Sequence, residues 1–67
     1  MKVEIRDTEY RKAHGKAPKN EYGFWLFEIE GCHEYSVYGK LSDAKKAVKE
    51  QIKQIYNQEY VFVEIMP

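Results

Sequence analysis

The feature that most constrains this chain is the alternation of residue type over positions 22–30, Tyr-Gly-Phe-Trp-Leu-Phe-Glu-Ile-Glu. Successive side chains of a strand point to opposite faces of a sheet. Trp25, Phe27 and Ile29 therefore share one face, which is wholly apolar. The other face mixes aromatic, aliphatic and acidic side chains: Phe24, Leu26, Glu28 and Glu30. The segment predicts a strand that buries the face of Trp25 in a core.

The rest of the chain supplies partners for this strand. Residues 34–39 predict a second strand, and strands this close in sequence pair as an antiparallel hairpin. Ser42 predicts the N-cap of a helix over 43–57, in which apolar residues recur at i, i+3 and i+4 spacing. Alternation predicts two further strands, near 2–10 and 60–66. The expected fold is α+β, in the order β-β-β-α-β, with one helix packed on one face of an antiparallel sheet.

The core of such a fold must come from apolar side chains alone. The chain has 67 residues and a single cysteine, Cys32, so no internal disulfide compensates for a small core. Hydrophobic residues make up 43% of the chain, enough to build one domain over 1–67. The residues predicted to form its core are Trp25, Phe27, Ile29, Val48, Ile52, Ile55, Val61 and Val63.

Composition also bears on location. A lone cysteine is typical of a reducing compartment. The first residues alternate charged and apolar types and contain no apolar signal-peptide region, and no run approaches the roughly 18 apolar residues that a membrane span needs. We expect a cytoplasmic protein that makes no membrane contact.

No residue pattern points to catalysis. A structural zinc site needs four ligands, and the Cys32-His33 dipeptide supplies at most two. Neighbouring side chains of a strand or tight turn point apart, so His33 is badly placed to activate Cys32. Glu28 and Glu30 lie on an open strand, without the cleft that separates the pKa values of an acid–base pair. The sequence predicts a non-enzymatic protein that needs no metal, cofactor or small-molecule substrate.

The strongest functional signal is apolar. If the face of Trp25 packs on the helix, a second set of large residues faces away from it, and these are predicted to form a partner interface: Phe24, Leu26, Tyr38, Tyr60, Phe62 and Met66. Such a surface is too apolar for a soluble monomer, unless the N-terminal segment folds over it. Interleaved glutamates favour a protein partner, or a second copy of the chain, over nucleic acid. We therefore expect a regulator or inhibitor that acts by protein–protein contact; phages and mobile elements commonly encode such small proteins.

The alternative function is binding of nucleic acid. Eleven basic and eleven acidic residues give a net charge of zero, which argues against a dedicated nucleic-acid binder. The basic residues are nevertheless clustered in a predicted loop over 11–19 and along one side of the predicted helix, where a phosphate backbone would lie. The residues of this possible contact are Arg11, Lys12, Lys16, Lys19, Lys45, Lys49 and Lys53.

A partial family resemblance points the same way. The matching letters are Tyr10-Arg11, Trp25-x-x-Glu28-Ile29, Gly39 and Ala44-x-x-Ala47. This pattern is similar to the three-stranded-sheet-plus-helix DNA-binding domain of plant ethylene-response factors and their phage integrase and endonuclease relatives. The resemblance implies that Arg11, Lys12 and Trp25 contact DNA. The chain departs from that family in its second strand, which lacks basic residues, and in its strong final strand.

Overall fold

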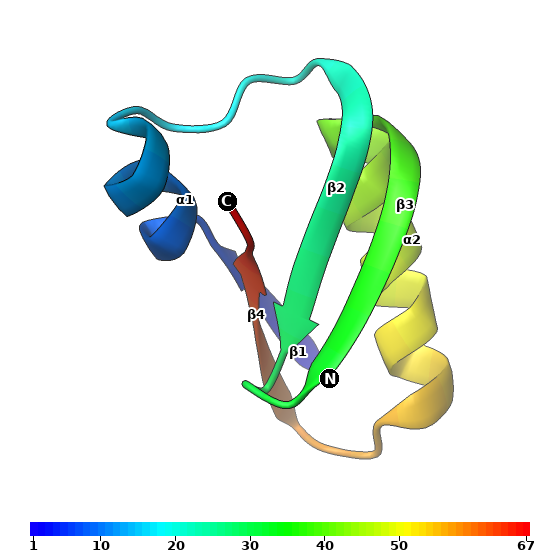
Figure 1. Ribbon diagram of the computed structural model, residues 1–67. Coiled ribbons are helices and arrows are strands. Elements are labelled where there is room, and N and C mark those ends of the chain that lie inside the picture. The colour runs from blue at the N-terminus through cyan, green and yellow to red at the C-terminus, as the bar shows by residue number, and fades with distance from the viewer.

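The computed structural model describes all of residues 1–67, and it contains four strands and two helices (Figure 1). In chain order these elements are β1 (Lys2–Arg6), α1 (Thr8–His14), β2 (Tyr22–Ile29), β3 (His33–Lys40), α2 (Leu41–Ile55) and β4 (Tyr60–Ile65). The strands form one sheet in the order β1-β4-β2-β3. The α+β class is confirmed. No helix of the structure combines the length and the apolar character needed to cross a membrane.

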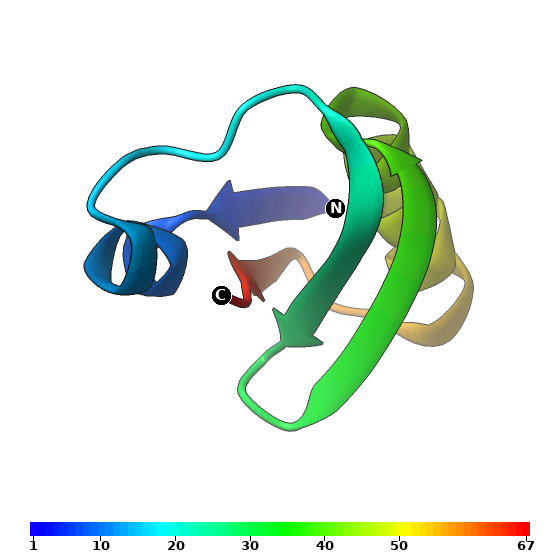
Figure 2. The same cartoon turned by 45° about the horizontal axis from the view of Figure 1, so that its top comes forward.

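The sheet is mixed rather than antiparallel, which corrects the sequence expectation. β2 pairs antiparallel with both β3 and β4, whereas β1 pairs parallel with β4 and places Val3 opposite Val61 and Ile5 opposite Val63. The chain leaves α2 at the end of the sheet where β1 also begins, so β4 runs in the same direction as β1 (Figures 1 and 2). The two ends of the chain thus form neighbouring strands.

A second correction concerns residues 8–14, which form α1 instead of extending the first strand to residue 10. Asp7 stands at the N-cap, and its Oδ2 forms an ion pair with Arg11 Nε at 3.1 Å. Glu9 lies in the first turn, and its Oε1 forms an ion pair with Lys12 Nζ at 3.9 Å. Gly15 ends the helix with a left-handed φ of 72°, the conformation that a helix C-terminus favours in glycine. The predicted basic loop over 11–19 is therefore helical up to His14, and its remaining residues belong to the connection between α1 and β2.

The helix α2 begins two residues before the predicted start. Its N-cap is Lys40 rather than Ser42, and its first residue, Leu41, is buried. The free backbone N–H of Ser42 donates to Asn20 Oδ1 at 2.9 Å, so a side chain from the α1–β2 connection caps the helix. Burial of Leu41 favours the earlier start because it extends the apolar stripe of α2 onto the sheet.

The core lies between α2 and the inner face of the sheet, which is the face turned toward α2. Its buried residues are Trp25, Phe27, Ile29, Leu41, Ala44, Val48, Ile52, Val61, Val63 and Ile65. Among the residues predicted to form the core, Ile55 alone is misplaced, with 63% of its surface exposed. Ile55 is the last helical residue and stands to the side of the buried stripe, close to the start of β3. The other predicted core residues are buried.

Candidate protein-binding face

The face of the sheet opposite α2, here called the outer face, carries every residue predicted to form a partner interface. In Figure 1, α2 lies behind β2 and β3, and no element lies in front of these two strands. Alternating burial along β2, β3 and β4 assigns the odd-numbered residues to the core and the even-numbered residues to the outer face. The predicted residues on the outer face are Phe24, Leu26, Tyr38, Tyr60, Phe62 and Met66.

One end of the outer face is aromatic and exposed. Phe24 and Tyr38 face each other across β2 and β3, with ring centroids 5.1 Å apart in an edge-to-face arrangement. They are 55% and 69% exposed, and Tyr22 beside them is more exposed still. Leu26 and Phe62, by contrast, are half-buried. The freely accessible apolar surface therefore lies at the end of the sheet where β2 begins and β3 ends.

A cleft of about 340 Å³ adjoins this aromatic end, between α1 and the first half of β2. Its lining residues are Tyr10, His14, Glu21, Tyr22, Gly23, Phe24, Trp25, Leu26, Met66 and Pro67. On the α1 side, the rings of Tyr10 and His14 stack at 4.1 Å between centroids. The volume is close to the lower end of the range for ligand pockets.

The cleft exists because β4 leaves β2 early. The pairing of β4 with β2 ends at Ile65 opposite Phe27, followed by one hydrogen bond from Met66 N–H to the Leu26 carbonyl at 2.8 Å. Backbone groups of alternate residues in a strand point the same way, so those of Phe24 also point toward the cleft. No strand of the chain pairs with Phe24 on that side. The cleft thus combines an apolar lining with unpaired backbone groups.

The middle of the outer face is acidic. Glu28 on β2 stands directly opposite Glu34 on β3 and opposite Glu64 on β4, so three carboxylates form a row across three strands. None of the three forms an ion pair within the chain. Glu64 Oε2 is moreover buried without a hydrogen-bond partner. Like charges directly opposite one another destabilise a sheet, so this acidic row weakens the fold that carries it.

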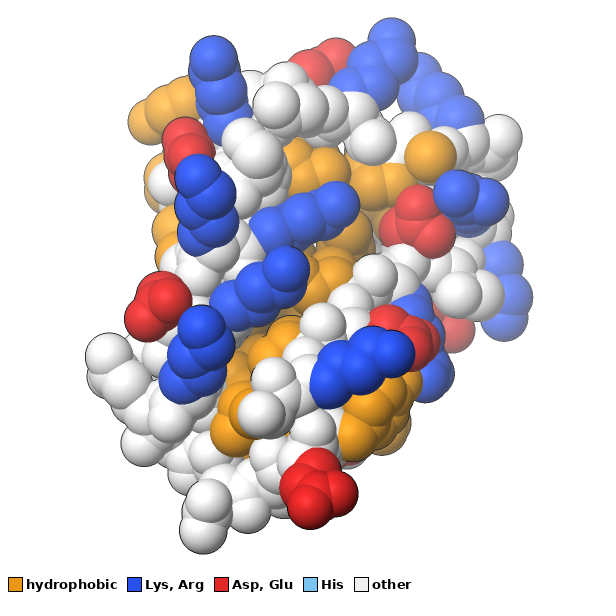
Figure 3. Space-filling view, turned by 180° about the vertical axis from the view of Figure 1, so that it is seen from behind, with side chains coloured by type: hydrophobic (Ala, Val, Ile, Leu, Met, Phe, Trp, Pro, Cys, Tyr) orange, Lys and Arg blue, Asp and Glu red, His pale blue; other side chains and the backbone are white.

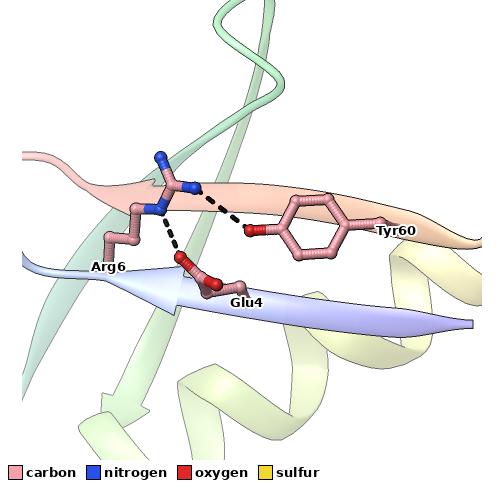
Figure 4. Close-up of polar contacts among 3 residues, drawn as sticks. All are labelled: Glu4, Arg6 and Tyr60. Carbon is pink, nitrogen blue, oxygen red and sulfur yellow. Dashed lines mark hydrogen bonds and ion pairs between the residues drawn. The ribbon is translucent and has the colours of Figure 1, made fainter.

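Arg6 faces one residue of the acidic row across the sheet, but its side chain bonds to other residues. Arg6 on β1 faces Glu64 on β4, but its side chain forms an ion pair with Glu4 and donates to the Tyr60 hydroxyl at 3.0 Å (Figure 4). The guanidinium carbon also lies 5.0 Å from the ring centroid of Phe62. The hydrogen bond from Arg6, followed by that with Tyr60, lowers the pKa of Glu4. Arg6 therefore neutralises Glu4 and leaves the acidic row unpaired.

The candidate nucleic-acid residues lie in other places. Seen from behind, Lys and Arg side chains gather over α2 with acidic and apolar side chains between them (Figure 3). Lys45, Lys49 and Lys53 lie on α2, and Lys53 pairs with Glu50 at 3.7 Å. The remaining cations, on α1 and in the connection that follows it, are Arg11, Lys12, Lys16 and Lys19. The helix lysines are thus separated from the aromatic end of the outer face by the thickness of the sheet.

Trp25, which the family resemblance places against DNA, faces the core and is 9% exposed. Its indole N–H donates to the carbonyls of Gly39 at 3.1 Å and Glu21 at 3.3 Å, and so ties the start of β2 to the end of β3. The cleft was not predicted from the sequence, because Tyr10 and His14 face each other only if residues 8–14 are helical. Asp7, Glu9 and Gly15 were the signals of that helix.

Comparison of the chain with protein-family models, with curated proteins and with solved structures finds no match. The chemistry of the outer face therefore has to support the functional argument.

Proposed function

We propose that this chain is a small non-enzymatic binding protein, a regulator or inhibitor that occupies the surface of a partner protein with the outer face of its sheet. The observation that carries the proposal is the unpaired row of Glu28, Glu34 and Glu64 beside the exposed rings of Phe24 and Tyr38. In the chain without a partner, both features are unfavourable, because the carboxylates repel one another and the rings are in contact with water. A partner that covers this face relieves both costs.

The composition of the face indicates the chemistry of the partner. Three carboxylates favour a surface with Lys or Arg side chains, which also steer association when charges are complementary. The aromatic end and the adjoining cleft favour an apolar anchor residue close to those cations. Negatively charged phosphates would meet the acidic row at close range, which disfavours nucleic acid on this face.

The test is capture of partners on the immobilised chain from nuclease-treated cell extract, followed by titration calorimetry with each purified partner. Phe24→Lys and Glu28→Lys are expected to raise Kd by about tenfold or more, as for a central interface residue. Phe24 is exposed, so the substitution leaves the core intact. Lys49→Glu on α2 is the matched charge-reversal control and is expected to change Kd by less than about twofold.

The same experiment decides against the proposal if the pattern is reversed. Binding from untreated extract that requires Lys49 and Lys45, tolerates Phe24→Lys and is lost in the nuclease-treated extract would identify a nucleic-acid module that uses the helix lysines. Such a complex would also weaken steeply with salt, since phosphate contacts release counterions.

A further inference from the structure

The strand β3 forms one edge of the sheet, and its outward backbone groups have no partner in the chain. Two backbone hydrogen bonds join even-numbered residues of β2 and β4 or their direct continuations: Met66 N–H donates to the Leu26 carbonyl, and Glu30 N–H donates to the Phe62 carbonyl. Even-numbered residues of β2 thus point toward β4, and odd-numbered residues bond to β3. In the register observed, odd residues of β2 face odd residues of β3. The even residues of β3 therefore direct their N–H and C=O groups outward, and these are Glu34, Ser36, Tyr38 and Lys40.

This edge lacks three of the devices that usually prevent strands from pairing, and its charged side chains are limited to Glu34 and Lys40. Edge strands are commonly short, interrupted by proline or bulged. β3 has eight residues, no proline, and continuous one-to-one pairing with β2. The opposite edge, β1, is shorter and carries the ion pair between Glu4 and Arg6. The contrast singles out β3 as the edge that accepts another strand.

The charges on β3 are arranged symmetrically. Glu34 and Lys40 lie three residues before and three residues after Val37, on the outer face, and neither forms an ion pair within the chain. If two copies of β3 pair antiparallel about a two-fold axis at Val37, Glu34 of each copy stands opposite Lys40 of the other. Glu34 and Lys40 of each copy then both gain an oppositely charged partner from the other copy.

Backbone geometry selects the same register. Outward groups belong to even residues, so the two-fold axis passes through a residue rather than between two residues, and Ser36, Val37 and Tyr38 are the candidates near the middle of the outward row. The axis at Val37 aligns all the outward residues and yields about eight hydrogen bonds, against about six for either neighbour. The axis at Ser36 places Glu34 opposite Tyr38, and the axis at Tyr38 leaves Glu34 without a facing residue. Charge and hydrogen bonding thus favour one register.

We propose that two copies of this chain associate through β3, antiparallel about a two-fold axis at Val37, and form one continuous eight-stranded sheet. The exposed Ile55 lies near this edge, where it lines a small hollow at the start of β3. The other lining residues are Ile29, His33, Glu34, Tyr35, Gln51 and Tyr56. The dimer leaves Phe24 and Glu28 accessible but engages Glu34 of the acidic row, so its dissociation constant is measured on the chain alone, without a partner.

Charge reversal tests the pairing. Glu34→Lys places lysine opposite lysine in the homodimer, and Lys40→Glu places glutamate opposite glutamate; each is expected to raise the dimer dissociation constant by about tenfold, measured by sedimentation equilibrium. An equimolar mixture of the two variants restores opposite charges at both positions. It is expected to form a heterodimer with an affinity within about threefold of the wild type. Neither substitution touches the core, and Glu34→Lys also relieves repulsion with Glu28.

Disulfide trapping tests the register. In a Cys32→Ser background, Val37→Cys is expected to form a symmetric intermolecular disulfide, because facing Cα atoms lie roughly 4.5–5.5 Å apart. Ser36→Cys is expected to remain reduced, since its two copies would lie about 8–9 Å apart in this register. A chain that stays monomeric at millimolar concentration, a dimer indifferent to both charge reversals, or preferential trapping through Ser36→Cys or Tyr38→Cys would each overturn the proposal.

Discussion

At the scale of single residues, Tyr56 shows how this small fold tolerates an unfavourable polar group. Tyr56 follows α2 directly, and its hydroxyl oxygen is buried without a hydrogen-bond partner. Its ring is 6.1 Å from His33, between centroids, and packs against the core. Burial raises the pKa of Tyr56, and electrostatic interactions with Cys32 and Glu30 raise it further. The ring stabilises the fold, whereas the hydroxyl opposes it.

Tyr56→Phe is therefore expected to raise the free energy of unfolding at neutral pH by about 1 kcal/mol, because it removes an unpaired buried hydroxyl. The effect also depends on pH. The folded state holds the Tyr56 proton more tightly than the unfolded state, so the wild type loses stability as the pH rises above the ordinary tyrosine pKa of 10.0 and through the raised folded value. The advantage of the variant should widen in that alkaline range.

Urea unfolding at pH 7 and at successive pH values above 9 measures both effects. Tyr22→Phe is the control, because Tyr22 is exposed and its substitution should change stability by less than about 0.5 kcal/mol. A Tyr56→Phe variant less stable than the wild type at pH 7 would show that the hydroxyl is satisfied by water.

At the scale of elements, the signals that succeeded are those read within a short stretch of chain. Alternation over 22–30 and a following strand predicted the β2–β3 hairpin, and apolar spacing predicted α2 to within two residues at each end. The spacing rule failed at Ile55, because a helix buries only the turns that lie over the sheet. The helix α1 was missed because its seven residues contain a single core-packed side chain, Tyr10, and too few apolar positions for a period to be visible.

The difference between Ile52 and Ile55 can be measured. Ile52 is completely buried on α2, so Ile52→Ala is expected to cost about 2–5 kcal/mol, most of the stability of so small a domain. Ile55→Ala should cost less than about 1 kcal/mol in the monomer. Chemical denaturation at a concentration below the dimer dissociation constant makes the comparison. Equal losses at both positions would mean that α2 is rotated relative to the structure.

At the scale of the whole molecule, the sheet order and the parallel pairing of β1 with β4 were beyond the reach of the sequence. Both depend on where the chain re-enters the sheet after α2, and no local pattern encodes that choice. The outer face was predictable, because alternation assigns each side chain to a face once the helix side is known. The acidic row was not, since it depends on the register that aligns Glu28 with Glu34 and Glu64.

The acidic row implies a trade between stability and binding. Glu28 has a like-charged neighbour on each side, so Glu28→Gln is expected to raise the free energy of unfolding by about 0.2–1 kcal/mol, measured by thermal or urea denaturation. The same substitution should weaken binding to a basic partner. Glu59→Gln, in the exposed connection before β4, is the control and should leave both quantities unchanged. A loss of stability in Glu28→Gln would show that the row is already neutralised.

The pairing of β1 with β4 also determines when the chain can fold during translation. Val3 and Ile5 are synthesised well before the strand that pairs with them, which carries Val61 and Val63. Contacts between such distant segments carry a large loop-closure cost and slow folding, whereas the β2–β3 hairpin and α2 find their partners nearby. β4 must then insert between β1 and β2, strands already synthesised. Completion of this sheet therefore waits for β4, and until β4 is in place the apolar side chains of Val3 and Ile5 lack the strand that pairs with them.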